Sequence, residues 1–368
     1  MSRNRRSWVL ARRHPFSVVL VFAAIPSLAQ QPRLTNAKFE THPVTGGLVR
    51  TFQAIAAAED SPAWIGYAVR AVPGDHQMCC YSSFEDGGGN RCCRGCTLEG
   101  VRGVMAGPAL ANPVQLEASG QIFVLLRIEQ HALDRIRTFS AECELDGGGL
   151  PFHWLTGVAA ADSVAFLTNF ALQDDSAARH RRSEPAITAI ALHADPAADQ
   201  ALENFAAPRQ SESLREKATF WLGSARGRRG YEVLRRIVTE DSSDRVREKA
   251  IFGLSVSKEP DAVAVMIQVA KNDRSSHVRG QALFWLAQKA GQKAAAAITE
   301  AIENDPDTEV KKRAVFALQQ LPADQGVPLL IQVARSNKNP AVRKQAMFWL
   351  GQSQDPRAVR FFEEVLLR

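Results

Sequence analysis

The residues with the clearest potential for chemistry in this sequence are six cysteines. Five fall within the 18 residues CCYSSFEDGGGNRCCRGC and the sixth follows later; they are Cys79, Cys80, Cys92, Cys93, Cys96 and Cys143. Cysteines at this density form disulfides, bind zinc or exchange thiols. The CxxC ending at Cys96 has zinc-ligand spacing, but a vicinal pair stands where a second CxxC is expected about 12–20 residues away. A redox CxxC needs a strand–CxxC–helix setting, which the glycine-rich surroundings do not predict.

The first 29 residues bear on the choice between these chemistries. An arginine-rich stretch over 1–15 precedes a short apolar run over 16–29, and Ser27 and Ala29 are the small residues before a cut at Gln30. This pattern predicts a cleavable signal peptide and therefore a secreted or periplasmic protein, with no membrane span left after cleavage. The alternative is an uncleaved anchor helix, which Pro26 and the short run disfavour.

Export favours disulfides, because thiols oxidise outside the cytoplasm. Adjacent cysteines rarely bond to each other, so we expect Cys79 and Cys80 to reach across the loop at 87–89 toward Cys92, Cys93 or Cys96. Six cysteines allow 15 pairings, and the sequence does not choose among them. Zinc binding and free or redox-active thiols remain alternatives.

Motifs for other kinds of site are missing from the sequence. It has no HExxH, no phosphate-binding loop and no nucleophile motif. His76, His131 and His153 are scattered without the spacing of a site. We therefore expect no catalytic residue, no metal ion and no cofactor.

Composition narrows the class of protein. Of 368 residues, 45% are apolar and 23% charged, which excludes a disordered chain. The formal net charge is +6, but five arginines lie in the first 29 residues with no acid, so the remaining chain carries +1. That balance argues against a polyanionic partner such as nucleic acid.

Residues 30–175 have the pattern of a small α+β domain. Helical spacing covers 48–58 and 161–171, and strand patterns cover 64–72, 114–118, 122–129 and 135–145. Turn residues at 119–120 and 131–134 predict an antiparallel meander for the last three strands. A charged linker over 176–184 then leads to a periodic region over 185–368.

The periodic region repeats every 32 residues without insertion. Five segments align, LREKATFWL (214–222), VREKAIFGL (246–254), VRGQALFWL (278–286), VKKRAVFAL (310–318) and VRKQAMFWL (342–350). A second apolar helix follows each segment, and a weaker copy with Ala186 and Ile190 starts near Arg182. Helix N-cap residues stand three positions before the segments: Ser211, Ser243, Ser275, Asp307 and Asn339. Two helices per fixed period predict an α-solenoid.

These segments resemble HEAT repeats, particularly the short bacterial kind named after phycobilisome lyases, over residues 182–368. The resemblance implies a ladder between neighbouring units, in which an acidic residue precedes a basic one by six positions. The matching pairs are Asp241 and Arg247, Asp273 and Arg279, Asp305 and Lys311, and Asn337 and Arg343. Asn337 departs from the pattern because it carries no charge, and we expect it to mark the end of the stack.

The segments also place one phenylalanine per unit outside the predicted core face. At 100° per residue, the seventh position of each segment lies at about 240°, away from the core positions near 0–80° and 340°. The residues are Phe220, Phe252, Phe284, Phe316 and Phe348, flanked by Lys217, Lys249, Gln281, Arg313 and Gln345. Either these rings fill the space between units, or they form an aromatic stripe along a concave binding groove.

Solenoids of this kind usually act as binding surfaces, so the sequence favours a protein-interaction scaffold with an unidentified protein partner. The resemblance also implies an enzyme alternative, a bilin-lyase-like activity, and a less favoured nucleic-acid-binding protein. A deep pocket with converging acid and base would favour the enzyme, and a continuous basic stripe would favour nucleic acid. A shallow mixed groove would favour the protein partner.

Overall fold

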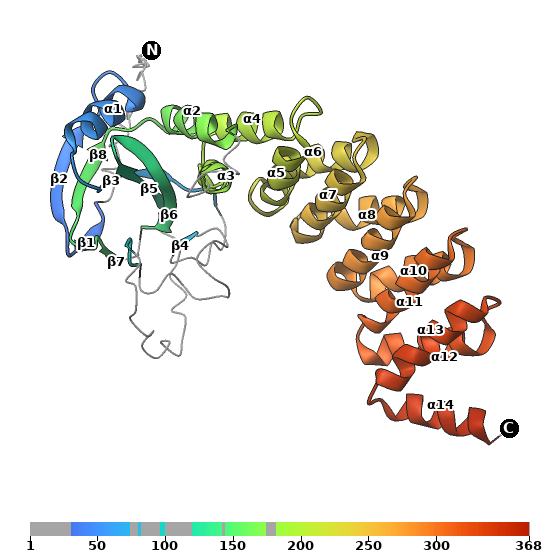
Figure 1. Cartoon of the computed structure of the whole chain (residues 1–368). Helices are drawn as coiled ribbons and strands as arrows, with labels where there is room; N and C mark the ends of the chain where they lie inside the picture. The colour runs from blue at the N-terminus through green and yellow to red at the C-terminus, as the bar shows by residue number, and fades with distance from the viewer. Residues whose placement is uncertain are drawn as a thin grey trace, which may run out of the picture.

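The computed structural model describes residues 31–73, 80–81, 96–99, 120–141, 144–173 and 182–367. A sheet domain leads into a curved array of helix pairs that ends at α14 (Figure 1). The predicted signal peptide, the predicted strand over 114–118, and Cys79, Cys92, Cys93 and Cys143 lie outside the described residues. Within the described ranges, no helix is long and apolar enough to span a bilayer.

The sheet domain combines parallel and antiparallel strands around one central sheet. Its elements are β1 (Arg33–Thr35), β2 (Lys38–Pro43), α1 (Leu48–Ala58), β3 (Ala63–Arg70), β4 (Cys80–Tyr81), β5 (Gln121–Glu129), β6 (Ala132–Ser140), β7 (Glu144–Asp146), β8 (Pro151–Thr156) and α2 (Ala160–Ala171). The described strands form a sheet in the order β2-β8-β3-β5-β6-β4, and β1 pairs separately with β7. Both predicted helices, over 48–58 and 161–171, are confirmed as α1 and α2.

The predicted meander is confirmed for β5 and β6, but it is only part of the sheet. β3 pairs antiparallel with β5, while β8 inserts between β2 and β3 and runs parallel to both. The predicted strand over 135–145 is instead two strands, because β6 ends at Ser140 and β7 joins β1. The turn also differs from the predicted 131–134. It lies at Gln130 and His131, both with positive φ, as a two-residue hairpin turn requires.

Each face of the sheet packs into its own core. On one face, alternate residues such as Ile65 and Val124 join the helices α1 and α2, where Phe52 and Phe166 pack with ring centroids 5.1 Å apart. On the opposite face a second cluster is fully buried; it contains Trp64, Leu98, Phe123, Leu125, Phe139, Phe152 and Trp154. Two apolar faces explain why these strands lack a polar side.

The array consists of six consecutive helix pairs. Its helices are α3 (Ser183–Leu192), α4 (Pro196–Phe205), α5 (Glu212–Ala225), α6 (Gly227–Glu240), α7 (Asp244–Val256), α8 (Ala262–Asn272), α9 (Ser276–Ala290), α10 (Gln292–Asn304), α11 (Thr308–Gln319), α12 (Ala323–Ser336), α13 (Pro340–Gln352) and α14 (Pro356–Leu366). The five segments of the 32-residue repeat lie in α5, α7, α9, α11 and α13, and α3 with α4 is the weaker copy. The helices therefore confirm the period.

The predicted N-cap residues are confirmed at all five positions. The side chains of Ser211, Ser243, Asp307 and Asn339 each accept a hydrogen bond from a first-turn backbone N–H. Ser275 occupies the N-cap of α9 without a side-chain cap bond. Each bond satisfies an N–H that the helix itself leaves free.

The sheet domain and the array share a continuous core. Helix α3 is buried along its whole length, and it begins at Ser183, inside the range predicted as a linker. A buried network joins Tyr67 of β3, Ser163 of α2 and His193 after α3, with O–O and N–O distances of 2.8 and 2.9 Å. His193 Nδ1 lies 2.7 Å from the Ala189 carbonyl oxygen. Burial lowers the pKa of His193 to about 4, so its ring stays neutral at ordinary pH.

A ladder of buried ion pairs connects neighbouring units of the array, but it joins other residues than the pairs that the resemblance matched. Arg247 donates two hydrogen bonds to Asp273 at 2.8 and 2.9 Å, and Arg279 does the same to Asp305. Arg215 pairs with Asp241. Each of these three arginines thus pairs with the aspartate 26 positions later, in the next unit. The residue six positions earlier contributes only its backbone carbonyl to Arg247, Arg279 and Arg343, and Lys311 donates to the carbonyl of Glu303 instead.

The array curves toward its odd-numbered helices. Neighbouring odd-numbered helices from α5 to α13 pack against one another more extensively than the even-numbered helices α6 to α14 do. At the tightest point, a Cβ on Gly223 of α5 would lie 2.0 Å from the carbonyl oxygen of Gly253 on α7, so these helices approach with no room for a side chain. The odd-numbered helices therefore line the concave side (Figure 1).

Candidate functional site

The phenylalanine stripe lies on the concave side of the array. Its five residues belong to α5, α7, α9, α11 and α13, one per helix. Phe220 and Phe348, at the two ends, are 37% and 53% exposed, and the three between them are half-buried. The rings therefore fill the space between units on one side and face solvent on the other. Each of the two predicted alternatives describes part of their environment.

The stripe is wider than predicted, because three tryptophans interleave with the phenylalanines. Eight rings form one continuous series that we call the aromatic ladder: Trp221, Phe220, Phe252, Trp285, Phe284, Phe316, Trp349 and Phe348. Successive ring centroids in this order lie 5.0, 5.8, 4.7, 4.9, 5.8, 5.0 and 4.9 Å apart. All these distances are in the range of favourable aromatic pairs. The ladder therefore crosses five units without a gap.

Small residues at alternate units make room for the tryptophans. The eighth position of the segments holds tryptophan in α5, α9 and α13, but Gly253 in α7 and Ala317 in α11. Its helical angle of about 340° predicts that this position belongs to the core. Gly253 and Ala317 are buried, whereas Trp221, Trp285 and Trp349 are half-buried and pack on the phenylalanines. The tryptophans therefore pack against the core only in part, while Gly253 and Ala317 lie fully inside it.

Charges of both signs flank the aromatic ladder. Lys217 donates to Ser183 Oγ at 3.3 Å, and Lys249 is exposed. The Arg313 side chain crosses Gly280 of the preceding unit, where a Cβ would lie 2.4 Å from Arg313 Cδ. Acidic side chains of the odd-numbered helices pair with side chains of the next unit. Glu216 of α5 lies 3.4 Å from Arg245 of α7, and Glu248 of α7 lies 3.0 Å from His277 of α9. Among the described residues this side carries no continuous basic stripe.

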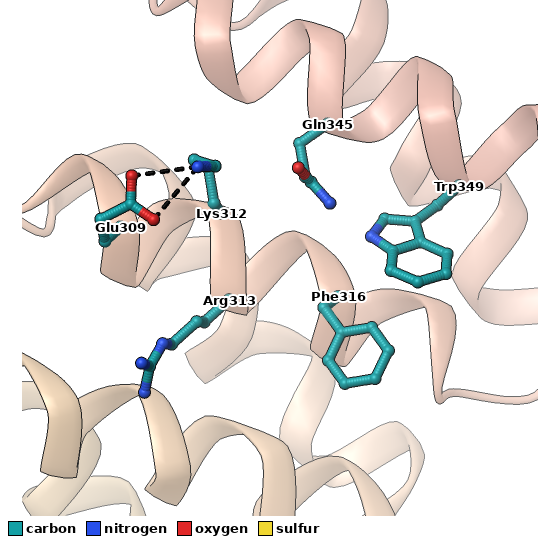
Figure 2. Close-up of a pocket in the computed structure, with 6 residues that line it drawn as sticks. All are labelled: Glu309, Lys312, Arg313, Phe316, Gln345 and Trp349. Atoms are coloured by element: carbon teal, nitrogen blue, oxygen red, sulfur yellow. Dashed lines mark hydrogen bonds and ion pairs between the residues drawn. The ribbon is translucent and has the colours of Figure 1, made fainter.

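A hollow of about 380 Å³ opens beside the ladder between α11 and α13 (Figure 2). Glu309, Lys312, Arg313, Phe316, Gln345 and Trp349 line it. Lys312 is held by Glu309 at 3.0 Å. The Trp349 indole Nε1 is buried and finds no hydrogen-bond acceptor among the described residues.

A comparison with family models identifies the repeats. The model for HEAT repeats covers residues 200–287 and 295–368. Residues 200–368 of this chain form HEAT repeats. Among curated proteins, a search found no significant match.

Solved structures with a similar arrangement include human deoxyhypusine hydroxylase in complex with glycerol. It is 15% identical, covers 56% of this chain and 90% of its own, and has a TM-score of 0.31. The complex of CpcE and CpcF of phycocyanin lyase from Nostoc is 17% identical, covers 56% of this chain and 93% of its own, and has a TM-score of 0.29.

The predicted cysteine cluster is described only in small part. Cys80 lies in β4, and Cys96 is buried in the second core of the sheet domain. Cys96 has a free thiol in this structure, which differs from its predicted place in a disulfide. Its side chain packs in the same apolar cluster as Leu98 and Phe139. The oxidation of the other cysteines stays a prediction.

One histidine that looked isolated in the sequence has close partners. His153 lies 3.0 Å from His42 and 2.9 Å from Glu59, counted between side-chain atoms. His153 is more than 90 positions from either partner in the chain, and it meets His42 because β8 pairs in parallel with β2. This cluster is not predictable from the sequence, because no short-range spacing signals a parallel pairing of strands.

Proposed function

We propose that this chain is an exported scaffold whose HEAT repeats bind a segment of a protein partner along the aromatic ladder. The observation that carries the proposal is the ladder itself, eight rings in unbroken contact that keep one side open to solvent. Aromatic side chains are enriched where proteins bind one another, since they offer a large, rigid apolar area.

The surroundings of the ladder favour a protein over the other partner classes. A nucleic-acid surface requires a run of lysine and arginine, but here Glu216 and Glu248 alternate with the basic side chains. The hollow between α11 and α13 is open, and its one carboxylate, Glu309, is paired with Lys312. That arrangement supports contact with a mixed apolar and polar segment, which an extended peptide or an amphipathic helix provides.

Export is part of the proposal and rests on the sequence of residues 1–29. The sheet domain would hold the first HEAT unit rigid, because the buried Tyr67–Ser163–His193 network joins them.

Affinity capture from the cell envelope fraction tests the proposal. The bait is the full chain, compared with a Phe284→Ser, Phe316→Ser variant and with Val359→Ser as control. Val359 is an apolar side chain on α14, in the even-numbered row, and is 53% exposed. We expect a protein that wild type and Val359→Ser retain and that the ladder variant, still helical by circular dichroism, loses.

The outcome against the proposal is equally specific. If the ladder variant retains the same proteins as wild type, the ladder is not the binding surface. If the captured material is nucleic acid that nuclease removes, the partner class is wrong.

A further inference from the structure

Three side chains with metal-ligating atoms meet at the edge of the sheet. Glu40 and His42 are two residues apart on β2, so they lie on the same face of the sheet. In the parallel pairing of β2 with β8, Glu40 stands opposite His153. The strand register therefore brings all three to one point.

The spacing of their ligand atoms suits a metal ion. His42 Nε2 lies 3.0 Å from His153 Nδ1, and Glu40 Oε2 lies 3.6 Å from the first and 3.8 Å from the second. Ligands of a tetrahedral zinc ion, with bonds of about 2.0–2.1 Å, are about 3.3 Å from one another. The three atoms thus form a triangle close to one face of such a tetrahedron.

Glu59 orients the buried histidine in the way metal sites require. His153 is 4% exposed, and its second ring nitrogen, Nε2, lies 2.9 Å from Glu59 Oε1. A proton on Nε2 donated to this carboxylate leaves the Nδ1 lone pair facing His42 and Glu40. A carboxylate behind a histidine ligand is the usual outer partner in zinc sites.

The surrounding charge also favours a cation. Glu59 is the C-cap of α1, so the cluster lies at the negative end of that helix. Glu40 is 65% exposed in its side chain and His42 is 34% exposed, which leaves the side opposite His153 accessible from solvent. An ion held by these three residues would keep one coordination position for water or another ligand.

We propose that Glu40, His42 and His153 bind a divalent transition-metal ion of the zinc class, with Glu59 as the outer partner of His153. The alternative is a metal-free cluster in which His42 donates a hydrogen bond directly to His153. Both arrangements use the same contacts, and metal binding separates them.

A calorimetric titration of the full exported chain with Zn²⁺ tests the proposal. We expect one ion per chain, with affinity lowered about 100-fold or more by His42→Gln or Glu40→Gln, which each remove a ligand. Glu59→Gln keeps the three ligands and is expected to lower affinity about 10–100-fold. His131→Gln, in the same domain but outside the cluster, is the matched control and leaves binding unchanged.

Cobalt substitution separates this site from the cysteines. Co²⁺ held by nitrogen and oxygen ligands gives visible d–d bands without thiolate charge-transfer bands, and His42→Gln abolishes them. The proposal is overturned if wild type and His42→Gln bind Zn²⁺ equally, if the cobalt spectrum shows thiolate ligands only, or if the dissociation constant is weaker than about 100 µM.

Discussion

At the scale of the residue, each phenylalanine of the ladder serves packing and exposure together. Phe284 stacks on Phe316 at 5.8 Å with nearly parallel rings, and it contacts Trp285 edge-on at 4.9 Å. Its remaining surface faces solvent. A ring in this position contributes to stability through its neighbours and still offers an apolar surface to a partner.

The energetic consequence is an intermediate cost of truncation. We expect Phe284→Ala to lower the free energy of unfolding by about 1–2 kcal/mol, since the change removes aromatic pairs but opens no closed cavity. The more exposed Phe348→Ala should cost about 0.5 kcal/mol or less. Urea denaturation measures both, with the fully buried Leu286→Ala as reference at about 2–5 kcal/mol. A cost for Phe284→Ala equal to that of the reference would make the ring a core residue.

At the scale of the element, the helices were largely predictable and the strands were not. The 32-residue period predicts every helix from α5 to α14, because each unit repeats its N-cap and its core face locally. Strand β8 depends instead on pairing with β2, more than 100 residues earlier in the chain, and no local pattern in the sequence PFHWLT indicates which strand it pairs with. The cluster of Glu40, His42 and His153 was not predicted for the same reason. The tryptophans of the aromatic ladder were not predicted either, because the helical angle of a position does not account for the size of its side chain.

Contacts between elements also make stability depend on pH. His193 links α3 to α2 and β3 while neutral, and its pKa of about 4 lies below the ordinary value of 6.5. The unfolded chain therefore takes up this proton first as pH falls. The contribution of the neutral His193 ring to the free energy of unfolding is complete above pH 6.5. It is lost as the pH falls from 6.5 to 4, and the loss amounts to about 3 kcal/mol.

The measurement is the free energy of unfolding at several pH values for wild type and His193→Gln. We expect the difference between the two proteins to shrink as pH falls from 6.5 to 4. A difference that stays constant over this range would show that the ring titrates normally.

At the scale of the whole molecule, the curvature of the array brings the aromatic rings of successive repeats together into one continuous surface. The odd-numbered helices pack closely and the buried arginine–aspartate ladder holds successive units in register, so the rings of five units meet in one line. The sheet domain is continuous with the first unit through a shared core. A partner lying along the concave side would contact several units at once, so that several weak contacts together give specific binding.

Site-specific photo-crosslinking in the native cell envelope tests this account most directly. The photoreactive residue p-benzoylphenylalanine replaces Phe348 in the ladder or, as the matched control, Val359 on α14; both side chains are 53% exposed. The account predicts a discrete protein adduct from position 348 that Phe316→Ser suppresses, and none of that mass from position 359. Adducts of the same mass from both positions, or an adduct at 348 that Phe316→Ser leaves unchanged, would contradict it.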